Sequence, residues 1–335
     1  MYKVLLTAIG CPNGYTAIKH LQRYGVHVIG ADARAAPVAA SLVDKFYTVP
    51  LANSSYFIDE IFDIVDTERP DVLVSQSEDE VAVLTKYVRD LDTRVLVATP
   101  PDAVHVSMDK WAVYDRAEEI GVPVPTYFPC TDHHELLLVV RKYLCEFGSA
   151  IVRPTRGKGS RGLRIVVPHI NRVGNRWQKW PDAAHISMVE MESCDLTKLH
   201  YPLIVSEPMQ GEVAFEGYVV DGKVLTGYLK QKRREVGNAS PSHTHNTCIE
   251  DDDLTGYAHK LVADFGGHSF VDVQFIQGKL MEINPRLSTQ IYTPDYNMIH
   301  FGILHTLGLM SDSEIAEKRL PLGKTAEFFW DLHYD

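Results

Sequence analysis

The sequence predicts an α/β protein that begins with a doubly wound, mostly parallel sheet and continues into a larger, strand-rich part. Over the first hundred residues, short apolar runs alternate with segments whose apolar residues recur at helical spacing. Such alternation predicts a parallel sheet with helices on both faces. With 335 residues, 45% of them hydrophobic and 23% charged, the chain is long enough for two or three packed units.

The elements of this N-terminal part follow from its periodicity. An apolar run begins at Lys3, and the glycine-rich stretch Gly10–Gly14 is typical of a turn before a helix. A second apolar run ends at Asp32. The predicted strands are Lys3–Ala8, Val26–Ala31, Asp71–Ser75 and Val95–Ala98, and the predicted helices are Tyr15–Tyr24, Phe57–Thr67 and Glu80–Asp90.

Two adjacent prolines, Pro100 and Pro101, mark the end of this part. A helix is predicted to run to Ile120, with Ser107 as its N-cap and Gly121 as the residue that ends it. The remaining elements are expected to be alternating helix and strand over 126–203, a strand-rich run over 204–283 with a helix at Leu254–Phe265, a helix at Met298–Leu309 and a strand at Glu327–Trp330.

The overall charge and the cysteines narrow the range of functions that the protein can have. A formal net charge of −11 argues against a nucleic-acid-binding protein, which needs excess Lys and Arg against phosphates. No apolar run approaches the ~18–20 residues that span a bilayer, so we expect no membrane association. The five cysteines form no CxxC pair, which is typical of free thiols in a reducing cytoplasm.

The turn after the first strand imitates a dinucleotide-binding fingerprint. Gly10 and Gly14 flank it, and Asp32 ends the next strand. However, Pro12 stands where the middle glycine of GxGxxG would let a pyrophosphate approach the backbone. A tight turn with close helix–strand packing would select the same glycines. A nicotinamide-dependent oxidoreductase is therefore the weakest interpretation.

The most informative segment is a strand–turn–strand pattern with a tight turn around Gly278. Because side chains two apart point the same way, Asp272 and Gln274 share a face of the first strand. Glu282 and Asn284 likewise share a face of the second. If the polar faces coincide, Gln274, Glu282 and Asn284 provide hard oxygen ligands suited to Mg²⁺ carrying a nucleotide's phosphates. An exposed hairpin with a polar outer face is the alternative.

Three further segments point to an anionic ligand. The loop Arg153–Arg164 combines cations with glycines whose backbone N–H groups can cradle phosphate oxygens, although a flexible basic hairpin is the alternative. The strand Leu203–Met209 runs into a polar hinge that can face an adenine edge, and an ordinary strand end would look the same. The basic stretch Lys230–Glu235 is typical of a solvated face, but it precedes the polar hairpin. Arg286, just past that hairpin, adds a permanent cation.

Together these motifs resemble the ATP-grasp superfamily over residues 105–310. Within it they are similar to the half-domain of the carbamoyl-phosphate synthetase large subunit and to its stand-alone relatives, which include amino-acid ligases. The segments that carry the resemblance are Asp109-Lys110, Val152–Pro154 with Gly157–Gly162, Ser206–Pro208, Lys232-Arg233, Gln274 and Glu282–Arg286.

The resemblance implies an N-terminal α/β domain (1–105), followed by an ATP-grasp domain (106–320) and a tail (321–335). The ATP-grasp fold consists of two α+β subdomains that clasp the nucleotide, with a mobile lid at about 126–203. ATP and Mg²⁺ are the implied cofactors, with two metal ions that Mn²⁺ can replace. The implied roles are nucleotide binding for Lys110, Arg153, Gly157, Lys158, Gly159, Ser160, Ser206, Glu207 and Met209, metal binding for Gln274, Glu282 and Asn284, and catalysis for Lys232, Arg233 and Arg286.

The chain departs from the family pattern at the ribose-binding glutamate. The family places this residue in a Gly-x-Glu-Tyr setting shortly after the hinge, where this sequence has Val213 or Ala214. Glu212 or Glu216 substitutes for it, or the ribose is held differently. Glu212 is the residue that we assign to the nucleotide.

The resemblance implies a ligase that joins a small-molecule carboxylate to an amine through an acyl phosphate, with an amino acid as one substrate. Glu78 is expected to meet a substrate ammonium group, and Ser288 lies in a second substrate loop. We expect a cytoplasmic protein that can form a homodimer. The alternatives are a carbamoyl-phosphate-forming enzyme, which a single copy of the grasp unit disfavours, and a non-catalytic ATP-binding sensor, which the intact Glu282, Asn284 and Arg286 disfavour.

Overall fold

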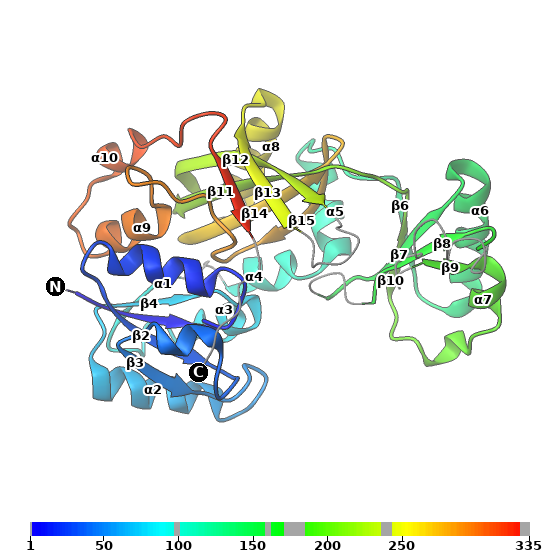
Figure 1. Cartoon of the computed structure of the whole chain (residues 1–335). Helices are drawn as coiled ribbons and strands as arrows, with labels where there is room; N and C mark the ends of the chain where they lie inside the picture. The colour runs from blue at the N-terminus through cyan, green and yellow to red at the C-terminus, as the bar shows by residue number, and fades with distance from the viewer. Residues whose placement is uncertain (1, 97–100, 158–161, 171–184, 236–242, 329–335) are drawn as a thin grey trace. The chain divides into compact units, whose positions relative to one another are not determined.

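The computed structural model describes residues 2–96, 101–157, 162–170, 185–235 and 243–328 (Figure 1). The chain forms two compact units. Unit 1 comprises Met1–Ser107, Gly211–Phe275 and Glu282–Asp335, and unit 2 comprises Met108–Gln210 with Ile276–Met281. The N-terminal sheet therefore belongs to the same unit as most of the strand-rich region.

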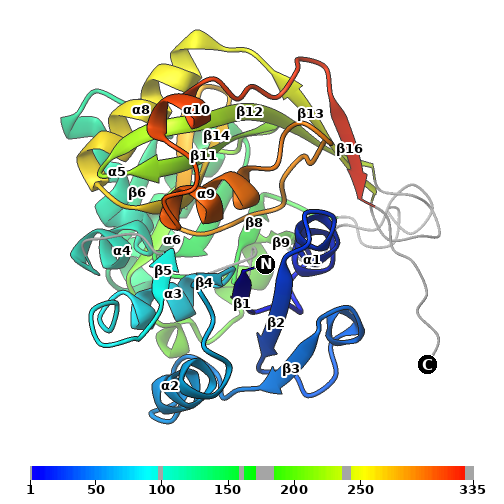
Figure 2. The same cartoon turned by 90° about the vertical axis from the view of Figure 1, so that its left-hand side faces the viewer.

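The N-terminal sheet of unit 1 is parallel and doubly wound, as predicted. Its strands lie in the order β3-β2-β1-β4-β5, with α1 and α2 on opposite sides of the sheet (Figures 1 and 2). All four residues of β4 are buried, which explains why its first three residues are apolar without interruption. The elements are β1 (Lys3–Thr7), α1 (Gly14–Gln22), β2 (His27–Asp32), β3 (Lys45–Thr48), α2 (Phe57–Glu68), β4 (Val72–Ser75), α3 (Glu78–Leu84), β5 (Arg94–Leu96) and α4 (Pro101–Ser107).

Strand β3 was missed by the sequence analysis. It is a four-residue edge strand with exposed ends and half-buried middle residues. An edge strand pairs on one side only, so it lacks the apolar run that marks β1 and β4.

The second sheet of unit 1 has six strands in the order β15-β14-β11-β12-β13-β16. Helices α8 and α9 both pack against β11. Phe270, Tyr296 and Ile299 join Val4 and Leu6 of the N-terminal sheet in one apolar core. The elements are β11 (Glu212–Val220), β12 (Lys223–Glu235), β13 (His243–Ile249), α8 (Asp252–Phe265), β14 (Ser269–Ile276), β15 (Lys279–Asn284), α9 (Met298–Thr306), α10 (Asp312–Ala316) and β16 (Thr325–Phe328).

Unit 2 is a smaller α+β body. Its sheet has the order β6-β10-β7-β8-β9, and the pairs are antiparallel except for β8 with β9. Leu136 and Val140 of α6 pack on Val152 and Val205 of the sheet. The elements are α5 (Lys110–Glu119), β6 (Tyr127–Cys130), α6 (His133–Phe147), β7 (Ala150–Pro154), β8 (Arg164–Val167), β9 (His185–Ser187), α7 (Met188–Glu192) and β10 (Leu203–Ser206).

The prediction that Ser107 caps the next helix is wrong. Ser107 ends α4, and its hydroxyl donates back to the Val104 carbonyl at 2.8 Å. Asp109 is the N-cap of α5 and accepts a hydrogen bond from the Trp111 N–H at 3.1 Å. An Asp carboxylate caps as well as a Ser hydroxyl, so propensity alone could not choose between them. Gly121 does follow the helix with a positive φ of 72°, as predicted.

Within the described ranges, no helix combines the length and the apolar character needed to cross a membrane.

Candidate active site

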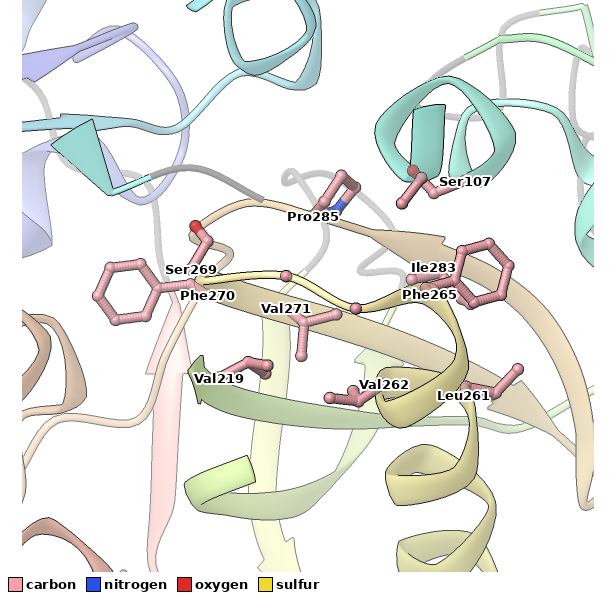
Figure 3. A pocket seen from close by; sticks show the side chains of 13 residues that line it. Ser107, Val219, Leu261, Val262, Phe265, Ser269, Phe270, Val271, Ile283 and Pro285 are labelled. Atoms are coloured by element: carbon pink, nitrogen blue, oxygen red, sulfur yellow. The ribbon is translucent and has the colours of Figure 1, made fainter. Parts of the chain in front are cut away.

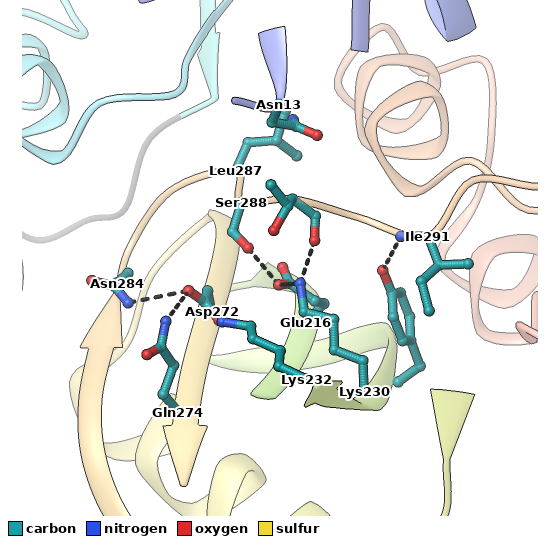
Figure 4. A network of polar contacts seen from close by, with 12 residues as sticks. Asn13, Glu216, Lys230, Lys232, Asp272, Gln274, Asn284, Leu287, Ser288 and Ile291 are labelled. Carbon is teal, nitrogen blue, oxygen red and sulfur yellow. Dashed lines mark hydrogen bonds and ion pairs between the residues drawn. The ribbon is translucent and has the colours of Figure 1, made fainter. Parts of the chain in front are cut away.

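The β14–β15 hairpin brings the three predicted metal ligands together in unit 1. Its turn has positive φ angles at Gln277 (51°) and Gly278 (79°), the two left-handed residues of a tight hairpin turn. Near the strand ends, the Gln274 amide donates to Asp272 Oδ2 at 2.8 Å. The Asn284 amide donates to Asp272 Oδ2 and to Glu282 Oε1, both at 3.2 Å (Figure 4). The polar faces of the two strands therefore coincide.

The donor set of this cluster fits Mg²⁺. Mg²⁺ is commonly held by one or two carboxylates, with phosphates and waters completing its shell. Glu282 offers a carboxylate, and Gln274 and Asn284 offer amide oxygens, which are hard ligands as well. The Asp272 carboxylate accepts from the NH₂ groups of these two amides. Among the described residues, no three His, Cys, Asp or Glu side chains gather in a way that could hold a metal. A metal bound here would therefore depend on the amide oxygens.

Arg286 lies at the edge of the cluster and joins it to the N-terminal sheet. Its Nε donates to Glu78 Oε1 at 3.0 Å, and its Nη1 lies 3.9 Å from Asp272 Oδ2. Although burial lowers the pKa of Arg286, the carboxylates of Glu78 and Asp272 raise it above the usual value. The residue predicted to stabilise phosphate and the residue predicted to meet a substrate ammonium are thus an ion pair.

Lys232 is the second predicted catalytic cation that the structure describes. It lies directly opposite Glu212 on β11 and forms an ion pair with it. Burial lowers the pKa of Lys232, but Asp272 and Glu212 together raise it above its usual value. Arg233 follows Lys232 on β12, and its side chain lies outside the described part of the chain.

A buried ion pair between Lys230 and Glu216 underlies this face of the sheet. Both side chains are almost fully buried, at 0% and 1% exposed. The Lys230 ammonium also donates to the Thr289 carbonyl, and the Ser288 hydroxyl donates to Glu216 (Figure 4). The contact with Ser288 places this predicted substrate residue against a buried carboxylate. Glu212 is the more exposed of the two candidate ribose ligands.

The sequence analysis gave no site role to Lys230 or Asp272 and named Glu216 only as an alternative ribose ligand. Lys230 and Lys232 lie two apart on a strand and therefore share a face, which was the available signal. The basic character of Lys230–Glu235 predicted a solvent-exposed face instead.

Apart from Glu212, which belongs to unit 1, the predicted nucleotide residues that the structure describes lie in unit 2. The Lys110 ammonium donates to the Gly157 carbonyl at 3.0 Å, and buried Arg153 donates to the Tyr114 hydroxyl. The Arg153 Nε and the buried Ser206 hydroxyl have no partner among the described residues. Lys158, Gly159 and Ser160 of the predicted lid lie outside the described residues.

The hinge after β10 is held by Glu207. Its carboxylate accepts from the Thr126 N–H at 2.7 Å and pairs with Lys279, while Met209 follows in the irregular segment beyond the strand. The Glu207 backbone N–H also donates to the Thr126 carbonyl at 3.0 Å, so both the backbone and the side chain of Glu207 hold the hinge.

Loops at the carboxyl ends of β1 and β4 add further polar groups near Glu78. The Asn13 amide donates to Gln76 Oε1 at 3.0 Å, and its oxygen accepts from the Tyr292 hydroxyl at 3.2 Å. These ends adjoin the point where the strand order of the sheet reverses, a common place for ligands in α/β proteins. Glu78 begins the helix that follows β4.

The glycines near β1 are explained by packing. A Cβ on Gly14 would lie 1.8 Å from the Ile9 carbonyl oxygen, so no larger residue fits the turn. Asp32 accepts from the backbone N–H groups of Gly10 at 2.6 Å and Arg34 at 2.8 Å. The loop thus forms the tight turn that the sequence analysis gave as the other explanation of these glycines, in place of dinucleotide binding.

An apolar pocket lies behind the hairpin, lined by residues of unit 1 (Figure 3). Ile283 and Pro285 border it, and they alternate along the chain with Glu282 and Asn284. Val262 and Phe265 of α8 close another side. Because this lining is almost entirely apolar, the pocket does not suit nucleotide phosphates.

Comparisons with known proteins agree with this architecture. Residues 4–96 match the family described as the PylC-like N-terminal domain. The carbamoyl phosphate synthase large chain of Methanosarcina barkeri is 22% identical over 300 residues, which cover 82% of this chain and 26% of that protein. The chain thus spans about a quarter of the length of this relative.

Two solved structures share the fold over nearly the whole chain. The L-amino acid ligase of Bacillus licheniformis has a TM-score of 0.66 at 13% identity, covering 98% of this chain and 79% of that one. The N5-carboxyaminoimidazole synthetase of Staphylococcus aureus, complexed with ADP, has a TM-score of 0.64 at 14% identity, covering 96% and 79%. These matches confirm, at the level of the fold, the resemblance drawn from the motifs: the chain has the fold of the ATP-grasp ligases.

Proposed function

We propose that this protein is a Mg-ATP-dependent carboxylate–amine ligase that acts on an amino acid or a similar amino-carboxylate. The observation that carries the proposal is the grouping of Gln274, Glu282 and Asn284 around Asp272, with Arg286 at its edge. Hard oxygen ligands beside a permanent cation suit the transfer of a phosphoryl group.

The metal and the nucleotide have separate proposed ligands. Glu282, Asn284 and Gln274 would hold Mg²⁺, which neutralises charge on the transferred phosphoryl group when bound. Lys110 and Arg153 would contact the phosphates or the adenine, and Ser206, Glu207 and Met209 would line the adenine. Glu212 would bind the ribose, because it is more exposed than Glu216.

The proposed reaction has two steps. A substrate carboxylate oxygen attacks the γ-phosphorus of ATP, the bond to the ADP oxygen breaks, and an acyl phosphate forms. The substrate amine then attacks the acyl carbon, phosphate leaves with the former carboxylate oxygen, and an amide remains once the nitrogen loses its proton. Arg286 and Lys232 would stabilise negative charge on the transferred group.

The amino-carboxylate assignment rests on the pair formed by Glu78 and Arg286. A carboxylate beside a guanidinium offers complementary charges to the ammonium and carboxylate of an amino acid. Asn13, Gln76 and Tyr292 supply further donors and acceptors to the loops at the carboxyl ends of β1 and β4. The sequence likeness to carbamoyl phosphate synthase favours a second candidate, a carbamoyl-phosphate-forming activity on bicarbonate and ammonia.

Release of ADP with pools of amino acids, followed by mass analysis of the product, tests the proposal. Oxygen-18 in the substrate carboxylate should appear in the released phosphate, because that oxygen leaves with the phosphorus. Label that stays wholly in the amide would exclude the acyl phosphate. ADP formation from bicarbonate and ammonia alone would favour the second candidate.

A further inference from the structure

Asp272 occupies the centre of the polar cluster without being among the predicted metal ligands. Its side chain is buried, at 1% exposed. A single oxygen, Oδ2, accepts from both the Gln274 and the Asn284 amides and lies 3.9 Å from Arg286 Nη1. Figure 4 shows the two amides converging on this carboxylate from neighbouring strands.

The direction of these hydrogen bonds decides which end of each amide is left for a metal. A primary amide has a donor NH₂ at one end and an acceptor oxygen at the other. The NH₂ of Asn284 donates to Asp272 and also to Glu282, so both carboxylates draw the same end inward. The NH₂ of Gln274 is drawn to Asp272 in the same way. The oxygens of both amides are thereby turned away from Asp272.

We propose that Asp272 is a positioning residue that orients Gln274 and Asn284 so that their amide oxygens, and not their NH₂ groups, face the metal. The inference rests on the proposed function, because it presumes that the hairpin binds Mg²⁺. A metal cation is repelled by an NH₂ group, so a flip of either amide would remove a ligand and add a repulsive contact. Outer groups that orient metal ligands commonly change metal affinity by ~10–100-fold.

The substitution Asp272→Asn tests this orientation directly. Asparagine has nearly the same shape, but its oxygen is neutral and therefore a weaker hydrogen-bond acceptor than a carboxylate oxygen, so the interaction that fixes the direction of both amides is weakened. We expect the gain in ADP affinity that Mg²⁺ confers to fall at least ~10-fold, while ADP binding without metal stays unchanged. Titration calorimetry with ADP, with and without Mg²⁺, and Mn²⁺ binding by electron paramagnetic resonance measure these quantities.

A charge-conserving double variant supplies the rescue. This variant combines Asp272→Asn with Asn284→Asp. The new amide at position 272 donates to the new carboxylate at position 284 and still accepts from the Gln274 amide. The carboxylate then presents its second oxygen to the metal, so Mg²⁺-dependent ADP affinity should return to within ~3-fold of the wild type. Because the double variant keeps the buried charge, it is expected to fold even if the single variant does not.

The control is Asp253→Asn, which removes the same charge from an exposed position on α8 and should change nothing. The inference would be overturned if Asp272→Asn kept the wild-type gain in ADP affinity from Mg²⁺. It would also be overturned if the double variant folded but lacked that gain. Equal weakening of ADP binding with and without metal would mean a merely structural role and would overturn it too. If the wild type showed no Mg²⁺-dependent gain at all, the proposed function itself would fail.

Discussion

The cations of the polar cluster in unit 1 and the buried Arg153 of unit 2 are satisfied in different ways. In unit 1, Lys230, Lys232 and Arg286 are each paired with a carboxylate. In unit 2, the buried Arg153 donates to the Tyr114 hydroxyl, which is neutral. A cation whose contact is neutral keeps its charge for an incoming anion, whereas a paired cation holds a carboxylate in place. Under the proposed function, unit 1 supplies preorganised polar chemistry and unit 2 helps to attract phosphate.

The largest effect is expected from breaking the buried pair of unit 1. Lys230→Met leaves Glu216 buried without its cation, which should lower the free energy of unfolding by ~3–5 kcal/mol. Adding Glu216→Leu removes the stranded charge and should recover most of that loss. Denaturant unfolding of both variants measures the difference. A Lys230→Met protein as stable as the wild type would mean that the pair is not buried in solution.

The next effect concerns catalysis rather than stability. Glu282→Gln keeps the oxygen that accepts from Asn284 but removes the negative charge facing the proposed metal. We expect normal thermal unfolding and ADP release reduced at least ~100-fold, because neutralising charge is the main device of phosphoryl transfer. Asp253→Asn is the charge-matched control. Turnover at the wild-type rate in saturating Mg²⁺ would refute the proposed metal site.

A smaller effect is expected from removing a cation of unit 2. Lys110→Met should weaken ATP binding by ~10-fold, the scale of one charge-assisted hydrogen bond. The free energy of unfolding should change by less than ~0.5 kcal/mol, because the side chain is only partly buried. Arg116→Met on the same helix removes an exposed cation paired with Glu119 and serves as the control. If the two variants bound ATP with equal affinity, the proposed contact between Lys110 and ATP would be wrong.

A separate effect, on the pH dependence of stability, involves a buried group that is held neutral. His300 packs on Tyr24 and contacts the Tyr2 hydroxyl, and burial lowers its pKa from 6.5 to about 4. Between these values the unfolded chain binds a proton that the folded chain excludes. The free energy of unfolding should therefore be fully retained above pH 6.5 and should fall as the pH drops toward 4. His300→Phe should flatten this dependence in urea unfolding at pH 7 and 5, and an unchanged slope would count against the burial of a neutral imidazole.

Periodicity predicted the fold well wherever elements are long or fully buried. The apolar runs that form β1 and β4 and the helical spacing of α2 and α8 were recognised near their observed bounds. The edge strand β3 and the cap of α5 were not, because half-buried residues carry no clear period and because Ser107 and Asp109 are equally good caps. Motif spacing was sufficient to bring Gln274, Glu282 and Asn284 together, since a hairpin is a local structure.

The sequence by itself determined the parallel N-terminal sheet, the polar hairpin and the cations available for an anionic ligand. Only the tertiary structure decided which charges are buried and with whom they pair. Glu78 and Arg286 are separated by 208 positions, and their contact exists because the N-terminal sheet and the second sheet share one core. Likewise, the burial of Lys230 depends on the segment carrying Ser288 and Thr289, whose groups bond to Lys230 and Glu216. Local patterns encode which face a side chain takes, but the partner it meets there depends on how distant segments pack.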